Sequence, residues 1–308
     1  MNLYFLKHTV DETELCNLEK KCLFKVVNSQ NYFVIENYID VNRSPFVKYC
    51  IKDIMMTNSL ENLVELIREK DIAYDDFKVK YLDLDESTNF NRRHEIEGII
   101  GYVIRGLARV DAPSIIIGVT CIEGKWMLGI YLKNQGVWRD HNNRPQEYCN
   151  ALTTRVSRAI VNITVGAKVN CTIIDPCCGV GTVVMEAISM GFDIVGFDIN
   201  KNISEGAKRN LDFFGYPSVV KHGDIHNLQG HYDIAIVDLP YGILSFINRS
   251  EQLALVKSAK ALADKIAIIS AYDATYDFKN LGLNIIEKCI IPKGKFKRYL
   301  NICIKKTA

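Results

Sequence analysis

Two short segments of this 308-residue chain carry residues whose types and spacing could do chemistry. In the first, two isoleucines lead to an acid at position 175, and a turn of small residues runs to Thr182. Glycines in such a turn let the backbone approach a ligand closely, and the helix that follows offers unpaired N–H groups. The segment predicts a strand–turn–helix pocket for a nucleotide. Its expected binding residues are Asp175, Cys177, Gly179, Gly181 and Thr182.

The second segment, residues 234–242, is an apolar strand that ends in Asp238, Leu239, Pro240 and Tyr241. The exocyclic amines of nucleobases are poor nucleophiles because the ring delocalises their lone pair. A carboxylate and a backbone carbonyl that accept the amine's N–H bonds localise that pair for attack. An aromatic ring beside them can stack on a flipped base. We therefore expect Asp238, Pro240 and Tyr241 to be the catalytic residues of methyl transfer to a planar nitrogen.

Further cofactor contacts are expected where the next two strands end. Asp198 ends the strand 194–198 and is followed by Ile199, and in a doubly wound sheet an acid at this position accepts the ribose hydroxyls. Asp224 and Ile225 follow the strand 218–222 and would contact the adenine. The alternative interpretations are a helix-capping role for Asp198 and a surface turn for Asp224. The glycine loop could alternatively belong to an NAD-binding pocket, but the Gly-x-Gly-x-x-Gly pattern of such pockets is missing here.

The elements that position these residues alternate between strand and helix over residues 151–270, which predicts a parallel sheet with helices on both faces. The last two expected strands, 284–291 and 299–305, are separated by only seven residues. That connection is too short for a crossover helix, so the pair should form an antiparallel hairpin. The fold class is therefore α/β.

The N-terminal part mixes helices and strands and is expected to be α+β. Residues 1–48 resemble a strand–helix–strand opening of ferredoxin-like type, with strands at 2–9 and 32–39. Helices are expected at 60–70 and 92–106, and strands at 77–84, 114–120 and 126–132.

Composition sets broad limits. The net charge is +2, with 18 Lys+Arg against 21 Asp+Glu in residues 1–140 and 20 against 15 in the remainder. A nucleic-acid footprint must therefore be local. Ten scattered cysteines without a Cys-x-x-Cys pair indicate no metal site and fit a reducing cytoplasm. The first residues lack the features of a signal peptide, and no apolar run is long enough to span a membrane.

The motifs resemble those of a known enzyme class. The pattern Asp-Pro-x-x-Gly-x-Gly-Thr at 175–182 is similar to motif I of class I S-adenosylmethionine-dependent methyltransferases. The segment 238–241 is similar to the Asp/Asn-Pro-Pro-Tyr motif of amino-methyltransferases, with Leu239 in place of the first proline. The resemblance implies a Rossmann-like methyltransferase domain over residues 151–308 with S-adenosylmethionine as its cofactor.

Residues 49–136 resemble a THUMP domain through Gly98–Gly101, Pro113–Val119 and Leu128–Ile130. A linker over 137–150 carries His141, Arg144 and Pro145 and is similar to the interdomain segment of THUMP-containing tRNA guanine-N2 methyltransferases, as is the later run 159–162. That resemblance implies methylation of guanosine N2 in tRNA, with the THUMP-like domain docking the acceptor end of the RNA.

Local groups of cations supply candidate RNA contacts. The expected hairpin turn carries Lys293, Lys295, Lys297 and Arg298, and a helix start carries Arg92 and Arg93. Lys48 and Lys52 stand too isolated in the sequence to suggest a site.

Two alternatives stay open at this point. One is an amino-methyltransferase that acts on ribosomal RNA or on an adenine or cytosine amine. The other is a non-catalytic RNA-binding protein with a decayed enzyme domain, although Asp175, Gly179, Gly181 and Asp238 are all present.

Overall fold

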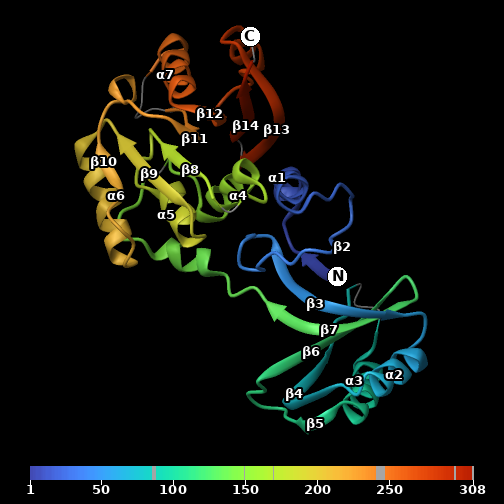
Figure 1. Cartoon of the computed structure of the whole chain (residues 1–308). Helices are drawn as coiled ribbons and strands as arrows, with labels where there is room; N and C mark the ends of the chain where they lie inside the picture. Colours follow the sequence, from blue (N-terminus) through green and yellow to red (C-terminus); the bar gives the residue numbers. More distant parts are fainter. Residues whose placement is uncertain (85–87, 149, 169, 241–246, 295, 307–308) are drawn as a thin grey trace. The chain divides into compact units, whose positions relative to one another are not determined.

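In a computed structural model the chain forms two compact units (Figure 1). The structure describes residues 1–84, 88–148, 150–168, 170–240, 247–294 and 296–306. The N-terminal unit comprises residues 1–7, 30–41 and 47–135, and the C-terminal unit comprises residues 8–29, 42–46 and 136–308.

The C-terminal unit is built on a seven-stranded sheet in the order β10-β9-β8-β11-β12-β14-β13. Its first five strands are parallel, and β14 and β13 complete the sheet as an antiparallel hairpin. Both the doubly wound sheet and the terminal hairpin are as the sequence predicts. The strands are β8 (Thr172–Asp175), β9 (Asp193–Asp198), β10 (Val220–His222), β11 (Tyr232–Asp238), β12 (Ala263–Ser270), β13 (Leu283–Lys293) and β14 (Phe296–Lys305).

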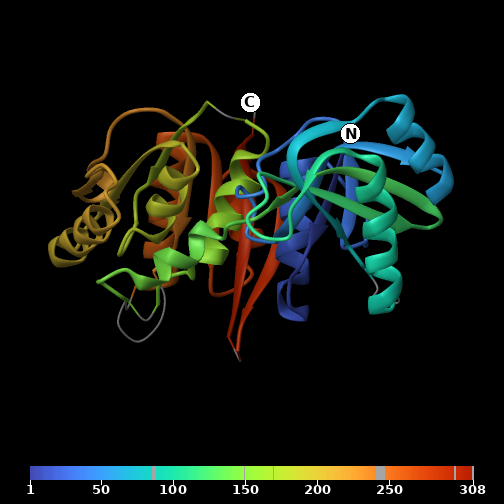
Figure 2. The ribbon, with the colours of Figure 1, turned by 90° about the horizontal axis from the view of Figure 1, so that it is seen from below.

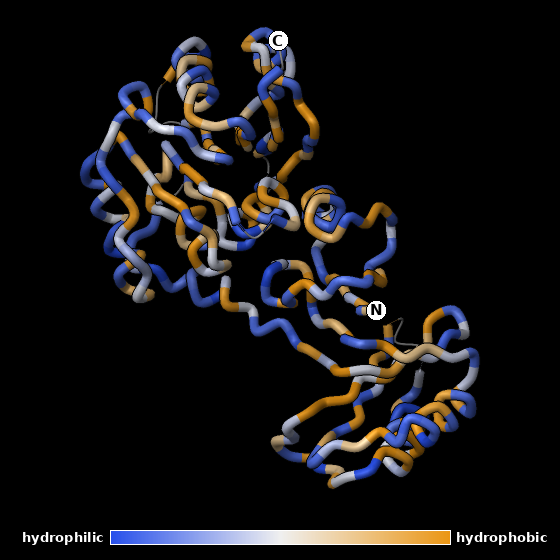
Figure 3. The backbone as a smooth tube through the Cα atoms, viewed as in Figure 1, coloured by the Kyte–Doolittle hydropathy of each residue, from blue (hydrophilic) through white to orange (hydrophobic). Residues whose placement is uncertain are grey.

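Helices cover both faces of this sheet because its central strands are apolar on both sides (Figures 1 and 2). On one face, Ala235 and Val237 of β11 pack with Val256 and Phe278 from α7 and α8. On the other, α4 contacts α5, β11 and β12. The helices are α4 (Thr154–Val165), α5 (Thr182–Ser189), α6 (Lys201–Phe213), α7 (Arg249–Leu262) and α8 (Thr275–Asn280), with short helical turns at Val137–Asn143 and Ile225–Asn227. In Figure 3, which colours the backbone by hydropathy, hydrophobic residues (orange) are frequent in these buried strands.

The segment 8–29 does not belong to the N-terminal unit, in contrast to the expected domain boundaries. It carries the helical turn Val10–Glu12, helix α1 (Thr13–Glu19) and the π-helical turn Lys20–Phe24, and it belongs to the C-terminal unit. Leu15, Leu18 and Leu23 are buried there, and α1 contacts α4 and β13. A domain boundary at residue 48 is therefore wrong, and the expected linker, 137–150, is part of the compact C-terminal unit.

The N-terminal unit is a second seven-stranded sheet in the order β2-β1-β3-β7-β6-β4-β5, with α2 and α3 on one face (Figure 1). The expected strand–helix–strand order at the start of the chain is present in β1, α1 and β2, but the two strands pair antiparallel. The strands are β1 (Asn2–Leu6), β2 (Tyr32–Ile35), β3 (Val47–Thr57), β4 (Ala73–Tyr81), β5 (Arg105–Ala108), β6 (Ile115–Ile122) and β7 (Lys125–Lys133). The helices are α2 (Leu60–Glu69) and α3 (Phe90–Val103).

Strand β3 is an inner strand of this sheet, between β1 and β7, and is absent from the sequence-based expectation. Its register with β7 shifts between Lys52 and Met55, and Asp53 has a positive φ of 55°. This bulge interrupts the alternation of buried and exposed side chains on which strand prediction depends. No helix among the described residues is long and apolar enough to cross a bilayer.

Candidate functional site

The glycine loop between β8 and α5 forms one wall of the site. Gly179 and Gly181 adopt positive φ angles of 54° and 81°, which favour glycine. A Cβ on Gly181 would also lie 3.2 Å from the Cβ of Ala207 in α6. The N–H of Cys177 donates to the carboxylate of Asp175 at 3.3 Å, and Asp175 is buried. The loop thus turns sharply at the carboxyl end of β8.

Asp198 ties the end of β9 to this loop. One carboxylate oxygen accepts the N–H of Gly179 at 2.9 Å, and the other accepts that of Asn200 at 2.8 Å. A carboxylate oxygen can accept more than one hydrogen bond, so these contacts leave capacity for ribose hydroxyls. Burial raises the pKa of Asp198.

Asp224 and Ile225 lie at the end of the neighbouring strand. Asp224 caps the short turn after β10 by accepting the N–H of His226 at 3.0 Å, and it lines the same cavity as Asp198. Ile225 is buried beside it, whereas Ile199, also in the cavity wall, is 67% exposed.

The end of β11 brings Asp238, Leu239 and Pro240 to this same cavity. Leu239 donates its N–H to the carbonyl of Ile269 at 2.9 Å, a hydrogen bond that the proline of the usual motif could not make. The carbonyl of Pro240 accepts from the side-chain amide of Gln252 in α7 at 2.8 Å. Tyr241, the expected stacking residue, lies outside the described residues.

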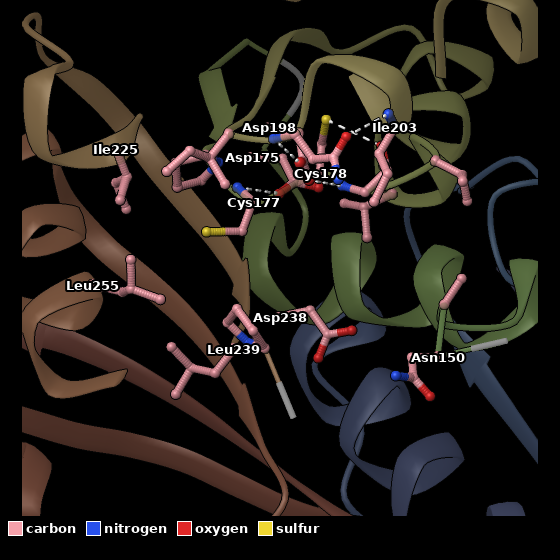
Figure 4. Close-up of a pocket in the computed structure, with 18 of the residues that line it drawn as sticks. Asn150, Asp175, Cys177, Cys178, Asp198, Ile203, Ile225, Asp238, Leu239 and Leu255 are labelled. Atoms are coloured by element: carbon pink, nitrogen blue, oxygen red, sulfur yellow. Dashed lines mark hydrogen bonds between the residues drawn. The ribbon is translucent and has the colours of Figure 1, made fainter. Parts of the chain in front are cut away.

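One cavity of about 500 Å³ therefore joins the glycine loop to the Asp238 turn (Figure 4). The sequence did not single out several of its lining residues, because they come from the linker, from the segment just before α4 and from helices without a motif. These residues include Tyr148, Asn150, Leu152, Ile203, Glu251 and Leu255.

The chemistry of the lining fits S-adenosylmethionine. Among the described lining residues there are five carboxylates and no lysine or arginine. The cofactor carries a sulfonium and an ammonium group, which such a lining attracts, whereas the pyrophosphate of a dinucleotide would be repelled. The buried hydroxyl of Thr182 at the start of α5 has no hydrogen-bond partner among the described residues and lines the cavity, where it can meet a ligand. S-adenosylmethionine, when bound, supplies the methyl group.

Burial also sets the protonation of the loop. It raises the pKa of Asp175 well above its ordinary value, and the nearby charges of Asp238 and Asp198 raise it further. Burial likewise raises the pKa of the Cys177 and Cys178 thiols. The thiols therefore stay neutral and act as small lining groups rather than as nucleophiles.

Two of the cations expected to contact RNA are exposed at the turn between β13 and β14. Lys293 and Lys297 are exposed at the β13–β14 turn, and Lys295 lies outside the described residues. Because Ser270 of β12 pairs with Tyr299, this turn lies at the sheet edge where β11 ends in Asp238.

The other expected cations are already engaged. Arg298 is only 2% exposed and donates to the carbonyl of Asn150 at 2.9 Å, so its placement among surface cations is wrong. Arg92 pairs with Glu95, and Arg93 pairs with Asp83, each at 2.8 Å.

The comparisons with known proteins agree with this geometry. The sequence profile of a family described as RMKL-like, methyltransferase domain, matches residues 141–259. A tRNA (guanine(10)-N2)-dimethyltransferase of Pyrococcus abyssi is 30% identical over 254 residues, which are 74% of each chain. This chain belongs to the family of that tRNA methyltransferase. It is an S-adenosylmethionine-dependent methyltransferase.

Two further proteins are similar to this family member. A tRNA (guanine(10)-N2)-dimethyltransferase of Methanothermobacter thermautotrophicus is 34% identical over 161 residues, 48% of this chain and 47% of the relative. The crystal structure of TrmN from Thermus thermophilus is 13% identical with a TM-score of 0.49 and covers 99% of both chains.

Proposed function

We propose that this enzyme transfers methyl groups from S-adenosylmethionine to the exocyclic N2 of guanosine 10 in tRNA and proceeds to the dimethylated base. The observation that carries the proposal is the shared cavity of the glycine loop and the Asp238 turn, in a chain of this family. Two curated relatives bear a name that states this activity.

The roles of the residues follow from the cavity. Asp175, Gly179, Gly181 and Thr182 line the cofactor end of the cavity or shape its loop, and Cys177 lines it too. Asp198 accepts the ribose hydroxyls, Asp224 accepts from the adenine amine, and Ile199 and Ile225 flank the ring.

At the other end, Asp238 accepts one N–H of the guanine amine. The second acceptor is a backbone carbonyl of the Leu239–Pro240 turn, where the carbonyl of Pro240 also accepts from the side-chain amide of Gln252. Two acceptors on the amine localise its lone pair towards the methyl donor. The target base must leave its stack to reach the cavity, and Tyr241 stacks on this flipped base.

The N-terminal unit, with its THUMP-like region, docks the tRNA, and Lys293, Lys295 and Lys297 hold its backbone beside the cavity. Arg298, the fourth cation expected at this turn, is buried and is therefore not among these RNA contacts.

The test combines the purified protein, S-adenosylmethionine and two tRNA transcripts that differ only at position 10, guanosine in one and adenosine in the other. Mass spectrometry of the nucleosides should show N2-methylguanosine and N2,N2-dimethylguanosine in the first transcript only. Methylation of ribosomal RNA instead, of an adenine or cytosine amine, or of no RNA would favour the alternatives and overturn the proposal.

A further inference from the structure

The N-terminal unit carries a cluster of lysines that the sequence does not reveal. Phe77 and Val79 of β4 pack under α2 and α3, so the alternating Lys78 and Lys80 project from the opposite face of the sheet. On that face Tyr49 of β3 is paired with Lys133 of β7.

Aromatic rings connect these lysines. The Nζ of Lys80 lies 4.7 Å from the centroid of the Tyr131 ring, and that ring lies 5.4 Å from the ring of Tyr49. The Nζ of Lys48 lies 5.5 Å from the Tyr49 ring. Lys48, Lys78, Lys80 and Lys133 thus gather around two tyrosines, and we call these six residues the lysine–tyrosine patch.

Several other cations of this unit have acidic partners that the patch lysines lack in the described structure. Arg105 pairs with Asp71, Arg109 with Asp76 and Lys52 with Asp53. Among the described residues, none of the four patch lysines forms an ion pair; Lys78 donates to a backbone carbonyl, that of Val110. Burial lowers the pKa of Lys80, and its neighbours Lys133, Lys48 and Lys78 lower it further. The only carboxylate in the described part of the chain that offsets these effects on Lys80 is the more weakly acting Glu97, so the patch keeps an excess of positive charge.

We infer that the lysine–tyrosine patch binds the phosphate backbone of the tRNA substrate. When lysines without ion pairs neutralise phosphates, the counterions of the nucleic acid are released, and this release is a large source of affinity for a nucleic acid. Cation–π contacts hold the ammonium groups of Lys48 and Lys80 against the tyrosine rings. This inference rests on the proposed function and relocates the RNA contact of this unit from Arg92 and Arg93, which are paired with acids, to the opposite face of the sheet.

The test compares the full-length parent with the variant K48Q/K80Q/K133Q. A matched control, K52Q/R105Q/R109Q, removes three cations of the same unit that already have acidic partners. Binding of a fluorescently labelled tRNA is measured by anisotropy at several KCl concentrations. S-adenosylmethionine binding is measured by calorimetry, to show that the catalytic unit is intact.

The patch variant should bind tRNA at least about 10-fold more weakly at moderate salt, and its salt slope should fall by about one for each lysine removed. The control should stay close to the parent, and methylation at saturating tRNA should continue in all three proteins. If the patch variant binds tRNA with the affinity and salt slope of the parent, the patch serves another anionic partner, such as an acidic protein, and the inference is overturned. An equal loss in the control also overturns it. Failure of the proposed function is recognised separately, by the absence of N2-methylated guanosine with the parent protein.

Discussion

Asp238 is the side chain whose removal should slow the reaction most. Asp238→Ala removes one of the two acceptors for the guanine amine, and loss of one preorganised polar contact costs on the order of 10²-fold or more in rate. The affinity for S-adenosylmethionine should change little, because the lost contact is made to the base and strengthens in the transition state. Single-turnover methylation and calorimetry measure the two quantities.

Asp238→Asn is the matched control, because its side-chain oxygen can still accept one N–H. It should lose less activity than Asp238→Ala. Near-full turnover of Asp238→Ala on tRNA would contradict the catalytic assignment, as would a product methylated on a ring carbon or on the ribose.

At the scale of elements, the β13–β14 hairpin carries two exposed lysines, Lys293 and Lys297, and one buried arginine, Arg298. Lys293→Ala with Lys297→Ala should weaken tRNA binding and lower its salt slope by about two, because both side chains are exposed at the sheet edge where β11 ends. The thermal midpoint should stay unchanged. Anisotropy and thermal melting together test this expectation.

Arg298→Ala should behave in the opposite way. Its buried guanidinium donates to the carbonyl of Asn150, which lines the cavity, so its loss should reduce the free energy of unfolding by about 2 to 4 kcal/mol. A variant that keeps parental stability but loses tRNA binding would restore Arg298 to the RNA surface.

Helix α1 contributes a buried carboxyl whose charge should be visible in the pH dependence of stability. Glu19 accepts hydrogen bonds from Ser44 and, at 2.6 Å, from the amide of Asn162 in α4. Burial raises the pKa of Glu19 to about 7. Between pH 4.5 and about 7 the folded protein therefore holds a proton that the unfolded chain releases, so stability falls as the pH rises through this window.

Glu19→Gln removes that titration. The free energy of unfolding of this variant, relative to the parent, should rise by up to about 3 kcal/mol from pH 4.5 to 7 and stay constant above. Urea unfolding at a series of pH values measures the difference. An identical pH dependence in both proteins would mean that the Glu19 carboxyl is ionised throughout.

At the scale of the whole molecule, the C-terminal unit depends on residues from the start of the chain. Arg158 of α4 donates to the carbonyls of Asn42 and Arg43 and pairs with Glu186 at 2.7 Å. Glu186 in turn contacts the buried His141 at 2.7 Å. A shortened chain that begins at residue 137 should therefore unfold without cooperativity and fail to bind S-adenosylmethionine.

A different deletion should preserve this unit. The N–H of Asn134 donates to the carbonyl of Lys48 at 3.2 Å, so the ends of the segment 48–134 lie together. Replacing that segment by a short Gly/Ser linker should keep S-adenosylmethionine binding and abolish tRNA methylation. Calorimetry and nucleoside analysis test both deletions, and a fully active chain starting at residue 137 would contradict the expectation.

The sequence alone determined the features that depend on residues close together in the chain. The glycine loop at 175–182, the acid at the end of β11, the alternation that makes a parallel sheet and the short connection before β14 are local patterns. In a parallel sheet the carboxyl ends of the strands share one edge, so these patterns also predicted that Asp175, Asp198 and Asp238 line one cavity.

Only the tertiary structure decided the features that depend on which distant segments pack together. Helix α1 joins the C-terminal unit because its buried leucines find α4 and β13, and Arg298 is buried although its neighbours in sequence are exposed. Lys48, Lys80 and Lys133 are scattered along the chain and meet only because β3 and β7 pair, and because β6 joins β7 to β4. Strand pairing across long loops is set by the packing of the entire sheet, which no spacing within a single segment encodes.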